Sequence, residues 1–198
     1  MISVGPQPEP NAFDVKVRKP GQRWISKSGL NPQQPVPSGQ KIPSHWTKCT
    51  DELHEAYGGI CAYLCVYIEL ASPPSVDHFV PKSTRLDLAY EWTNYRLAFS
   101  LMNSRKKAFE DVLDPFTLDA GTFELGLSME HIRPASGLPA PQTRAAQATI
   151  DRLKLNDATC RKIRLRHWTK YIQGRISSDE LREQSPFIWF EANRQNLL

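Results

Sequence analysis

The segment SVDHFVPKS, residues 75–83, places an aspartate directly before a histidine at the end of an apolar run. The carboxylate of Asp77 is a hard oxygen ligand of the kind that suits Mg²⁺. The imidazole of His78 can take a proton from water and prepare that water for in-line attack on a phosphate ester. The pair is therefore a candidate for metal-assisted phosphodiester hydrolysis, with a turn-capping aspartate and a strand-end histidine as the structural alternatives.

The elements around this pair decide which further groups can reach it. We expect SVDHFVP to be a strand end closed by Pro81, NYRLAFSL to be a second strand, and NSRKKAFEDVL to begin a helix. Asn94 opens the second strand, and Asn103 suits the first turn or the cap of the helix. In a unit of strand, loop, strand and helix, both amides can meet Asp77 and His78 at one edge.

Four motifs occur in the order DHFVPKS, EWTN, NSRK and TIDRLKLN. Together they resemble the core of the HNH endonucleases, which have the ββα-metal fold. The likeness is greatest to the HNH proteins of the Septu type and those associated with retrons, which act in anti-phage defence. It covers roughly residues 44–173 of the chain. The fold class implied is α+β, a ββα-metal core with surrounding helices and a Pro-rich N-terminal arm.

The resemblance implies a metal-dependent endonuclease that hydrolyses phosphodiester bonds in nucleic acid, the effector nuclease of a defence system. Asp77 and Asn103 would hold one Mg²⁺ or Mn²⁺, and His78 would be the general base. Asn94 would orient the loop or His78 itself through hydrogen bonds. The resemblance thus implies a hydrolytic site of four side chains, which come from both strands and from the helix.

Two lysines are candidates for substrate binding. Lys106 falls where many members of the family have an N-x-x-K ending, and it would contact the scissile phosphate; a solvated helix lysine is the alternative. Lys82 lies close enough to His78 in sequence to help hold the substrate. The expected substrate is DNA in preference to RNA. In Septu-type systems the HNH protein acts with an ATPase, so the resemblance also implies an ATPase partner subunit.

The chain departs from its relatives in its cysteines. Relatives usually carry two C-x-x-C pairs that bind a structural zinc. Here Cys61 and Cys65 are separated by three residues, and Phe99 and Met102 stand where the second pair would be. We therefore expect a remnant pair without structural zinc, and an apolar cluster of Phe99, Met102 and Cys61. A rescued zinc site that uses Cys49 or a histidine stays open.

Composition divides the chain into three parts. Residues 1–43 hold 8 of the 16 prolines and predict an extended arm, because proline lacks the N–H and restricts its predecessor. Residues 44–142 hold the nuclease core. Residues 143–198 are helical and end in the apolar tail SPFIWFEANRQNLL, which is either docked on the body or kept for a partner. The segment 143–175 has nine basic and two acidic residues, which suits a phosphate backbone or a solvated helix face.

Bulk features exclude several classes. An apolar content of 40% is enough for a core and argues against global disorder. There is no run of 18 apolar residues and no secretory signal pattern, and four cysteines are too few for a disulfide scaffold. We expect a cytoplasmic protein with reduced thiols and no membrane association. The alternative function is an HNH-like binding or assembly subunit with little activity of its own, docked through the arm and the FIWF tail.

Overall fold

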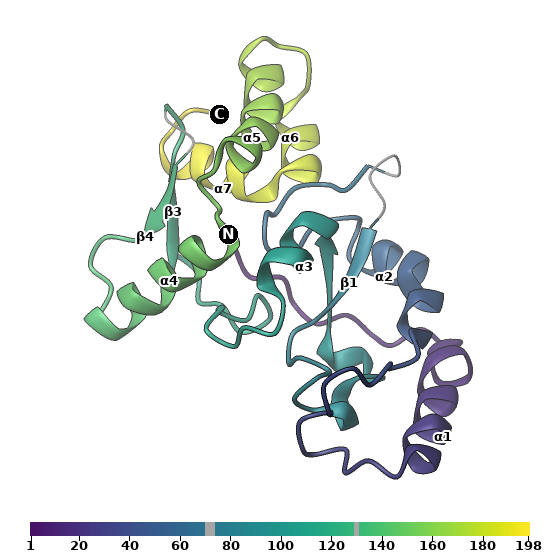
Figure 1. Cartoon of the computed structure of the whole chain (residues 1–198). Helices are drawn as coiled ribbons and strands as arrows, with labels where there is room; N and C mark the ends of the chain where they lie inside the picture. The colour runs from purple at the N-terminus through teal and green to yellow at the C-terminus, as the bar shows by residue number, and fades with distance from the viewer. Residues whose placement is uncertain (70–73, 129–130) are drawn as a thin grey trace. The chain divides into compact units, whose positions relative to one another are not determined.

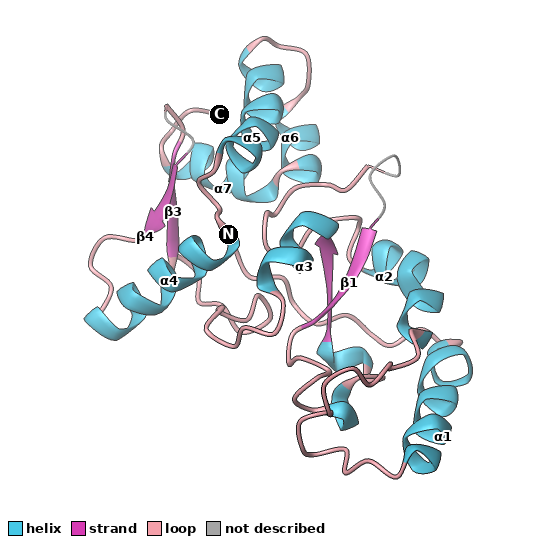
Figure 2. Cartoon of the chain, in the orientation of Figure 1, coloured by secondary structure: helices cyan, strands magenta, loops and turns pink. Residues whose placement is uncertain are grey.

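The computed structural model describes residues 1–69, 74–128 and 131–198 and shows a mixed α+β chain (Figure 1). Within that part of the chain there are seven α-helices and two antiparallel sheets of two strands each, which Figure 2 distinguishes by colour. The chain divides into two compact units. The site unit comprises Pro6–Gly59 and Leu70–Glu110, and the C-terminal unit comprises Met1–Gly5, Ile60–Glu69 and Asp111–Leu198. No helix among the described residues is both long enough and apolar enough to cross a bilayer.

The sheet of the site unit joins β1 (Pro74–His78) and β2 (Tyr95–Phe99), and α3 (Ser100–Lys106) follows β2 directly. The predicted order of strand, loop, strand and helix is confirmed. In the antiparallel register Asp77 lies opposite Arg96, and His78 lies opposite Tyr95. One detail differs: Asn103 is the fourth residue of α3, not its cap, because β2 runs into the helix without an intervening loop.

The N-terminal segment is not the extended arm that its prolines predict. A π-helical stretch (Asp14–Arg18) leads into α1 (Lys19–Ser28). The prolines flank this helix, and Pro20 sits in its first turn, where a missing N–H costs nothing. Phe13 and Val17 are 1% and 0% exposed, so the helix is anchored by apolar burial. Gly21 allows close approach, since a Cβ there would lie 2.2 Å from the ring of Tyr90.

The predicted helix after Ser44 is confirmed with a change of type along its length. It starts as a 3₁₀ helix (His45–Cys49) and continues as α2 (Thr50–Ala56). Its predicted inner face is buried at Cys49, Leu53 and Tyr57. Two further 3₁₀ turns, Leu86–Leu88 and Trp92–Asn94, lie in the connection between β1 and β2. The first of these corresponds to the helical turn predicted for LDLAYEW.

The run ICAYLCVYIEL does not form the strands that its β-branched and aromatic residues predict. Within its described residues the only ladder contact is an isolated bridge between Ile60 and Tyr67. The chain instead reverses at Cys65, which has a φ of 52° and donates its N–H to the carbonyl of Cys61 at 2.8 Å. These residues are buried, so their apolar character supports the core of the C-terminal unit and not a sheet. The final residue, Leu70, lies outside the described residues.

Four helices follow in the C-terminal unit; the sequence predicts the first three, whereas the fourth lies in the segment expected only as an apolar tail. They are α4 (Ala140–Leu153), α5 (Ala158–Ile172), α6 (Ser178–Gln184) and α7 (Pro186–Arg194). The predicted capping box of Ser177 and Glu180 is present at the start of α6. The break before α5 is also confirmed, although Asp157 and not Asn156 is the N-cap, with its carboxylate accepting from the Cys160 N–H.

The side chain of Asn156 binds the hairpin that is formed by β3 (Phe123–Gly126) and β4 (His131–Pro134). Its amide accepts from the Ile132 N–H at 2.8 Å and donates to the Ile132 carbonyl at 2.7 Å. A side-chain amide thus takes the place of a neighbouring strand along β4. Thr149, in the same TIDRLKLN motif, is fully buried and accepts from the Leu113 N–H. Thr149 and Asn156, the first and last residues of the motif, thus hold backbone segments together in this structure.

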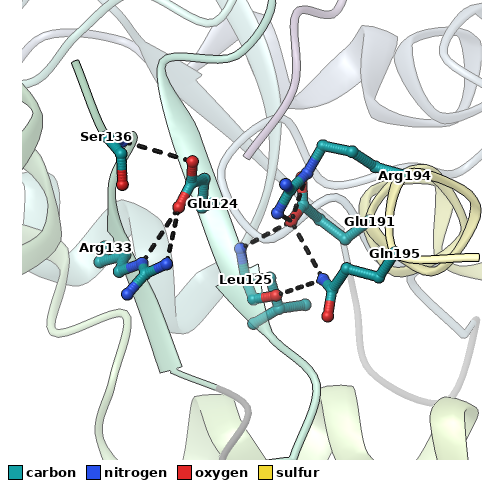
Figure 3. Close-up of polar contacts among 7 residues, drawn as sticks. All are labelled: Glu124, Leu125, Arg133, Ser136, Glu191, Arg194 and Gln195. Carbon is teal, nitrogen blue, oxygen red and sulfur yellow. Dashed lines mark hydrogen bonds and ion pairs between the residues drawn. The ribbon is translucent and has the colours of Figure 1, made fainter. Parts of the chain in front are cut away.

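The outer edge of β3 is covered by the C-terminal tail, which docks on its own unit. The α7 residues Phe187 and Ile188 are 1% and 2% exposed. Glu191 accepts from the Leu125 N–H at 3.1 Å, and Gln195 donates to the Leu125 carbonyl at 2.9 Å (Figure 3). The two side chains satisfy the backbone groups that an edge strand would otherwise leave unpaired. Of the two alternatives for the FIWF tail, docking on the body is therefore the observed one.

Replacing Glu191 with alanine should lower the free energy of unfolding of the C-terminal unit by about 1–3 kcal/mol. The Glu191 side chain is buried, and its loss leaves the Leu125 N–H without an acceptor and Arg194 without its ion-pair partner at 2.7 Å. Denaturant unfolding checks this value. The exposed Glu183 on α6 is the matched control, and Glu183→Ala should change stability by less than about 0.5 kcal/mol. Equal effects from the two variants would contradict the proposed role of Glu191.

Candidate functional site

The alternation of side chains along β1 separates the two residues of the Asp-His pair. Successive side chains of a strand point to opposite faces of the sheet. Ser75 and Asp77 contact α3, through Asn103 and Lys106 respectively. His78 lies on the other face, beside its cross-strand neighbour Tyr95. The site therefore lies at the end of β1. The Asp77 carboxylate is on the face of the sheet that α3 covers, and the His78 imidazole is on the opposite face.

His78 is held in one orientation by an aromatic cage and a backbone carbonyl. Its ring packs edge-on against Trp46 at 4.7 Å and against Tyr95 at 5.1 Å. Its Nε2 lies 2.9 Å from the carbonyl oxygen of Ala89. Because a carbonyl can only accept, Nε2 carries the proton, and Nδ1 is the basic nitrogen of the neutral ring.

The protonation state of His78 follows from its surroundings. The side chain is 5% exposed. Burial lowers the pKa of His78 to about 3, with the nearby ammonium of Lys82 acting in the same direction and the bond to Ala89 opposing it. The imidazole is therefore neutral at pH 7. A neutral imidazole with a defined tautomer can accept a proton at Nδ1, and a pKa of about 3 makes it a weak base at pH 7.

Lys82 lies beside this imidazole. Its Nζ is 5.0 Å from the centre of the Trp46 ring, in a cation–π contact. The residue is half-buried, and burial lowers the pKa of Lys82 while the Asp77 carboxylate raises it. Trp46 thus contacts both the histidine and the lysine. A partly exposed cation next to a neutral imidazole is an arrangement that can receive a phosphate.

Asp77 and Lys106 form a buried ion pair on the α3 side. Their side chains are 1% and 0% exposed, and Lys106 Nζ lies 3.6 Å from Asp77 Oδ2. The same Nζ donates to the carbonyl oxygens of His78 at 3.0 Å and Phe79 at 2.7 Å. The enclosed position rules out the alternative of a solvated helix lysine, whereas contact of Lys106 with the scissile phosphate stays a prediction. Helix periodicity explains it: Lys106 lies one turn after Asn103 and faces the same strand.

Asn103 crosses from α3 to β1. Its Nδ2 donates to Ser75 Oγ at 2.6 Å and to the carbonyl oxygen of Val76 at 3.2 Å. Because the Val76 carbonyl accepts only, the amide nitrogen must face the strand, and Oδ1 is turned away from it. The residue as a whole is half-buried.

Asn94 ties down the connection between the two strands. Its Oδ1 accepts from the Val80 N–H at 2.8 Å, and its Nδ2 donates to the carbonyls of Val80 at 2.9 Å and Leu88 at 3.1 Å. Its own carbonyl accepts from the Phe79 N–H. The side chain therefore fixes both ends of the loop that carries Lys82, with His78 immediately before it.

The residue types on the α3 side fit a hard divalent cation. The Asp77 carboxylate and the Asn103 amide oxygen are both oxygen donors, and both belong to side chains at the interface of β1 and α3. Lys106 Nζ lies 3.6 Å from Asp77 Oδ2, so a positive charge stands beside the carboxylate. Oxygen donors of this kind suit Mg²⁺ or Mn²⁺.

The cysteines are all described, and none is in a disulfide. Cys49, Cys61, Cys65 and Cys160 are buried thiols. Met102 is fully buried in the site unit, while Cys61 belongs to the C-terminal unit. In the remnant pair, Cys61 Sγ accepts from the Leu64 N–H at 3.5 Å, and Cys65 Sγ accepts from the Ile2 N–H at 3.4 Å.

Three contributors to the site were not identified from the sequence. Trp46 was predicted only as one position on a buried helix face, and Tyr95 and Ser75 were read as ordinary strand residues. Ser75 could have been found from the strand period, because residues two apart on β1 share a face with Asp77. Trp46 carried no such signal, since its approach to His78 depends on how the 3₁₀ helix packs against the strand. No protein-family model matches the chain, and no curated protein sequence matches it significantly.

Proposed function

We propose that the chain is a metal-dependent endonuclease of the HNH type, with a ββα-metal core formed by β1, β2 and α3. One observation carries the proposal: at the end of β1 the Nε2–H of His78 is bound by the Ala89 carbonyl, and the Asp77 carboxylate lies at the interface with α3, which carries the Asn103 amide. The proposed biological role is the effector nuclease of an anti-phage defence system, acting on DNA in preference to RNA with an ATPase partner. This role follows from the motif resemblance.

The residues of the site have distinct parts in the proposed reaction. His78 Nδ1 takes a proton from water, the water oxygen bonds to phosphorus, and the bond between phosphorus and the leaving ester oxygen breaks. The leaving oxygen takes a proton from solvent. Asp77 and Asn103 would hold Mg²⁺ or Mn²⁺, which when bound stabilises negative charge on the phosphate and on the leaving oxygen. Asn94 keeps the loop in register with the strand, so that His78 and Lys82 stay together.

Lys82 and Lys106 differ in the proposed mechanism. Lys82 is partly exposed and is the phosphate-binding cation, held over Trp46. Lys106 is enclosed and braces the strand end through the carbonyls of His78 and Phe79. The bracing keeps the Asp77 carboxylate and the backbone around the imidazole in a single arrangement before substrate arrives. Pre-organisation of this kind is a major source of catalytic rate.

Metal dependence tests the proposal. The purified chain should cleave plasmid DNA with Mg²⁺ or Mn²⁺ and stop when EDTA is added. Asn103→Ala removes one proposed ligand, so cleavage at limiting metal should fall at least about tenfold and recover in part as metal concentration rises. The control is Asn193→Ala, which changes an exposed amide on α7. Cleavage that persists in EDTA would contradict the metal dependence of the proposed reaction. No cleavage of DNA or RNA with either metal would contradict the proposal and favour an assembly subunit.

A further inference from the structure

Helix α5 has an inverted distribution of polar and apolar side chains. Its inward face carries Arg164 and His167, which are 1% and 2% exposed. Its outward face carries Leu165 and Ile172, which are 40% and 62% exposed. An ordinary surface helix of a globular unit shows the opposite arrangement. Large exposed aliphatic side chains gathered on one helix face mark an interaction surface.

The rotation of α5 is set by specific contacts of its buried polar residues. Arg164 Nη2 donates to the carbonyl oxygen of Leu155 at 2.8 Å. His167 Nδ1 lies 2.8 Å from Ser185 Oγ, and both side chains are buried. Turning the helix to bury its aliphatic residues would break both interactions. The Leu155 carbonyl and the Ser185 hydroxyl would then lose these partners inside the unit. The contacts of Arg164 and His167 therefore keep the apolar side chains of α5 on its outward face.

The outward face of α5 carries one apolar stripe, and the charged residues beside it are all basic. Leu165, Trp168 and Ile172 are spaced i, i+3 and i+7, so they share one side of the helix. Arg161 and Lys162 lie one turn before Leu165, and α5 contains no acidic residue. Trp168 is half-buried, with its ring stacked on Tyr171 at 5.5 Å. We call Leu165, Trp168 and Ile172, with Arg161 and Lys162, the α5 face.

We propose that the α5 face binds an acidic amphipathic helix of a partner protein. Anchors at i, i+3 and i+7 are the spacing with which one helix recognises another, and the flanking cations select acidic residues beside the partner's apolar stripe. A second copy of the chain is disfavoured, because two identical basic faces would repel. The proposal does not depend on the nuclease function, since it uses the C-terminal unit alone.

Two other classes of ligand fit the α5 face less well. Nucleic acid would use the cations, but the exposed aliphatic residues offer no base stacking, and Tyr171 already covers part of the Trp168 ring. An anionic membrane would use both, but the opposite side of α5 is buried in its unit, so only one narrow stripe is free to insert.

The test uses the full chain and a defined probe. The probe is a fluorescent helical peptide of about 18 residues, roughly five turns, with leucines at i, i+3 and i+7 and glutamates beside them. A scrambled peptide of the same composition is the reference. Fluorescence anisotropy should show binding of the amphipathic peptide only. Leu165→Ser with Ile172→Ser should weaken binding at least about tenfold, whereas Leu197→Ser, which alters an exposed leucine of the same unit, should not.

Charge reversal provides a second arm. Arg161→Glu with Lys162→Glu should weaken binding of the acidic peptide and permit binding of a version with lysines in place of the glutamates. Failure of the acidic peptide to bind, or equal binding of the scrambled peptide, would overturn the proposal. So would preferential binding of a single-stranded oligonucleotide or of phosphatidylserine-containing vesicles that is lost in the Leu165 and Ile172 variant. Circular dichroism of each variant shows that the C-terminal unit remains folded.

Discussion

Replacing His78 with alanine should lower the single-turnover rate of DNA cleavage by about 10²–10⁴-fold at saturating metal. The variant removes an imidazole at the strand end whose tautomer is set by a backbone carbonyl. Metal binding should change little, because the proposed ligands lie on the other face of β1. The rate loss should therefore persist at every Mg²⁺ or Mn²⁺ concentration, in contrast to the effect of Asn103→Ala.

The controls for this experiment separate chemistry from folding. His54→Ala changes another histidine of the site unit, on α2, and should cleave at the parental rate. Because the His78 ring packs between Trp46 and Tyr95, its loss also leaves a cavity, so His78→Gln is needed as a larger replacement. If His78→Gln melts near the parental temperature and still cleaves at the parental rate, the general-base assignment is wrong.

Lys106→Met should lower the free energy of unfolding of the site unit by about 3–5 kcal/mol. The substitution keeps the apolar stem but leaves the buried Asp77 carboxylate without the ammonium at 3.6 Å. It also removes the donor that serves the carbonyls of His78 and Phe79. Adding Asp77→Asn to Lys106→Met should restore part of the stability, because the buried carboxylate charge that Lys106 faced is then gone.

The matched control is Lys107→Met, since Lys107 is the exposed neighbour at the end of α3 and should change stability by less than about 0.5 kcal/mol. Denaturant unfolding gives the stabilities, and the cleavage assay gives a second readout. If Lys106 contacted the substrate phosphate, Lys106→Met would weaken substrate binding and leave the unfolding free energy unchanged. That outcome would overturn the bracing role and return Lys106 to the substrate-contacting residues.

Local signals account for most of the elements that were predicted correctly. The strand at 74–78 lies before the turn at Pro81, and the strand at 95–99 is a short, mostly apolar run. Helices α4, α5 and α6 have apolar periodicity or side-chain caps within a few residues. Such signals depend on neighbours in sequence and can be read without the fold. The N-terminal arm was misread because its proline count was averaged over 43 residues, whereas the helix at 19–28 lies between the clusters.

The buried run around Cys65 shows that strand propensity alone does not predict a strand. β-branched and aromatic residues favour strands, but they equally favour the interior, and here a left-handed residue reverses the chain before a ladder can form. The apolar residues of the C-terminal tail also allow two interpretations, docking on the body or binding a partner. In the structure the tail docks on its own unit, where Glu191 and Gln195 bind the backbone N–H and carbonyl of Leu125.

The sequence by itself determined the order of the elements and the residue types of the candidate site, because strand period, helix period and motif order are local properties. Only the tertiary structure decided what each side chain meets. It placed Asp77 and His78 on opposite faces of β1, enclosed Lys106 and left Lys82 partly exposed beside Trp46. These outcomes depend on which helix packs on which face of the sheet. Burial, and with it the charge state of His78, is set by residues distant in sequence.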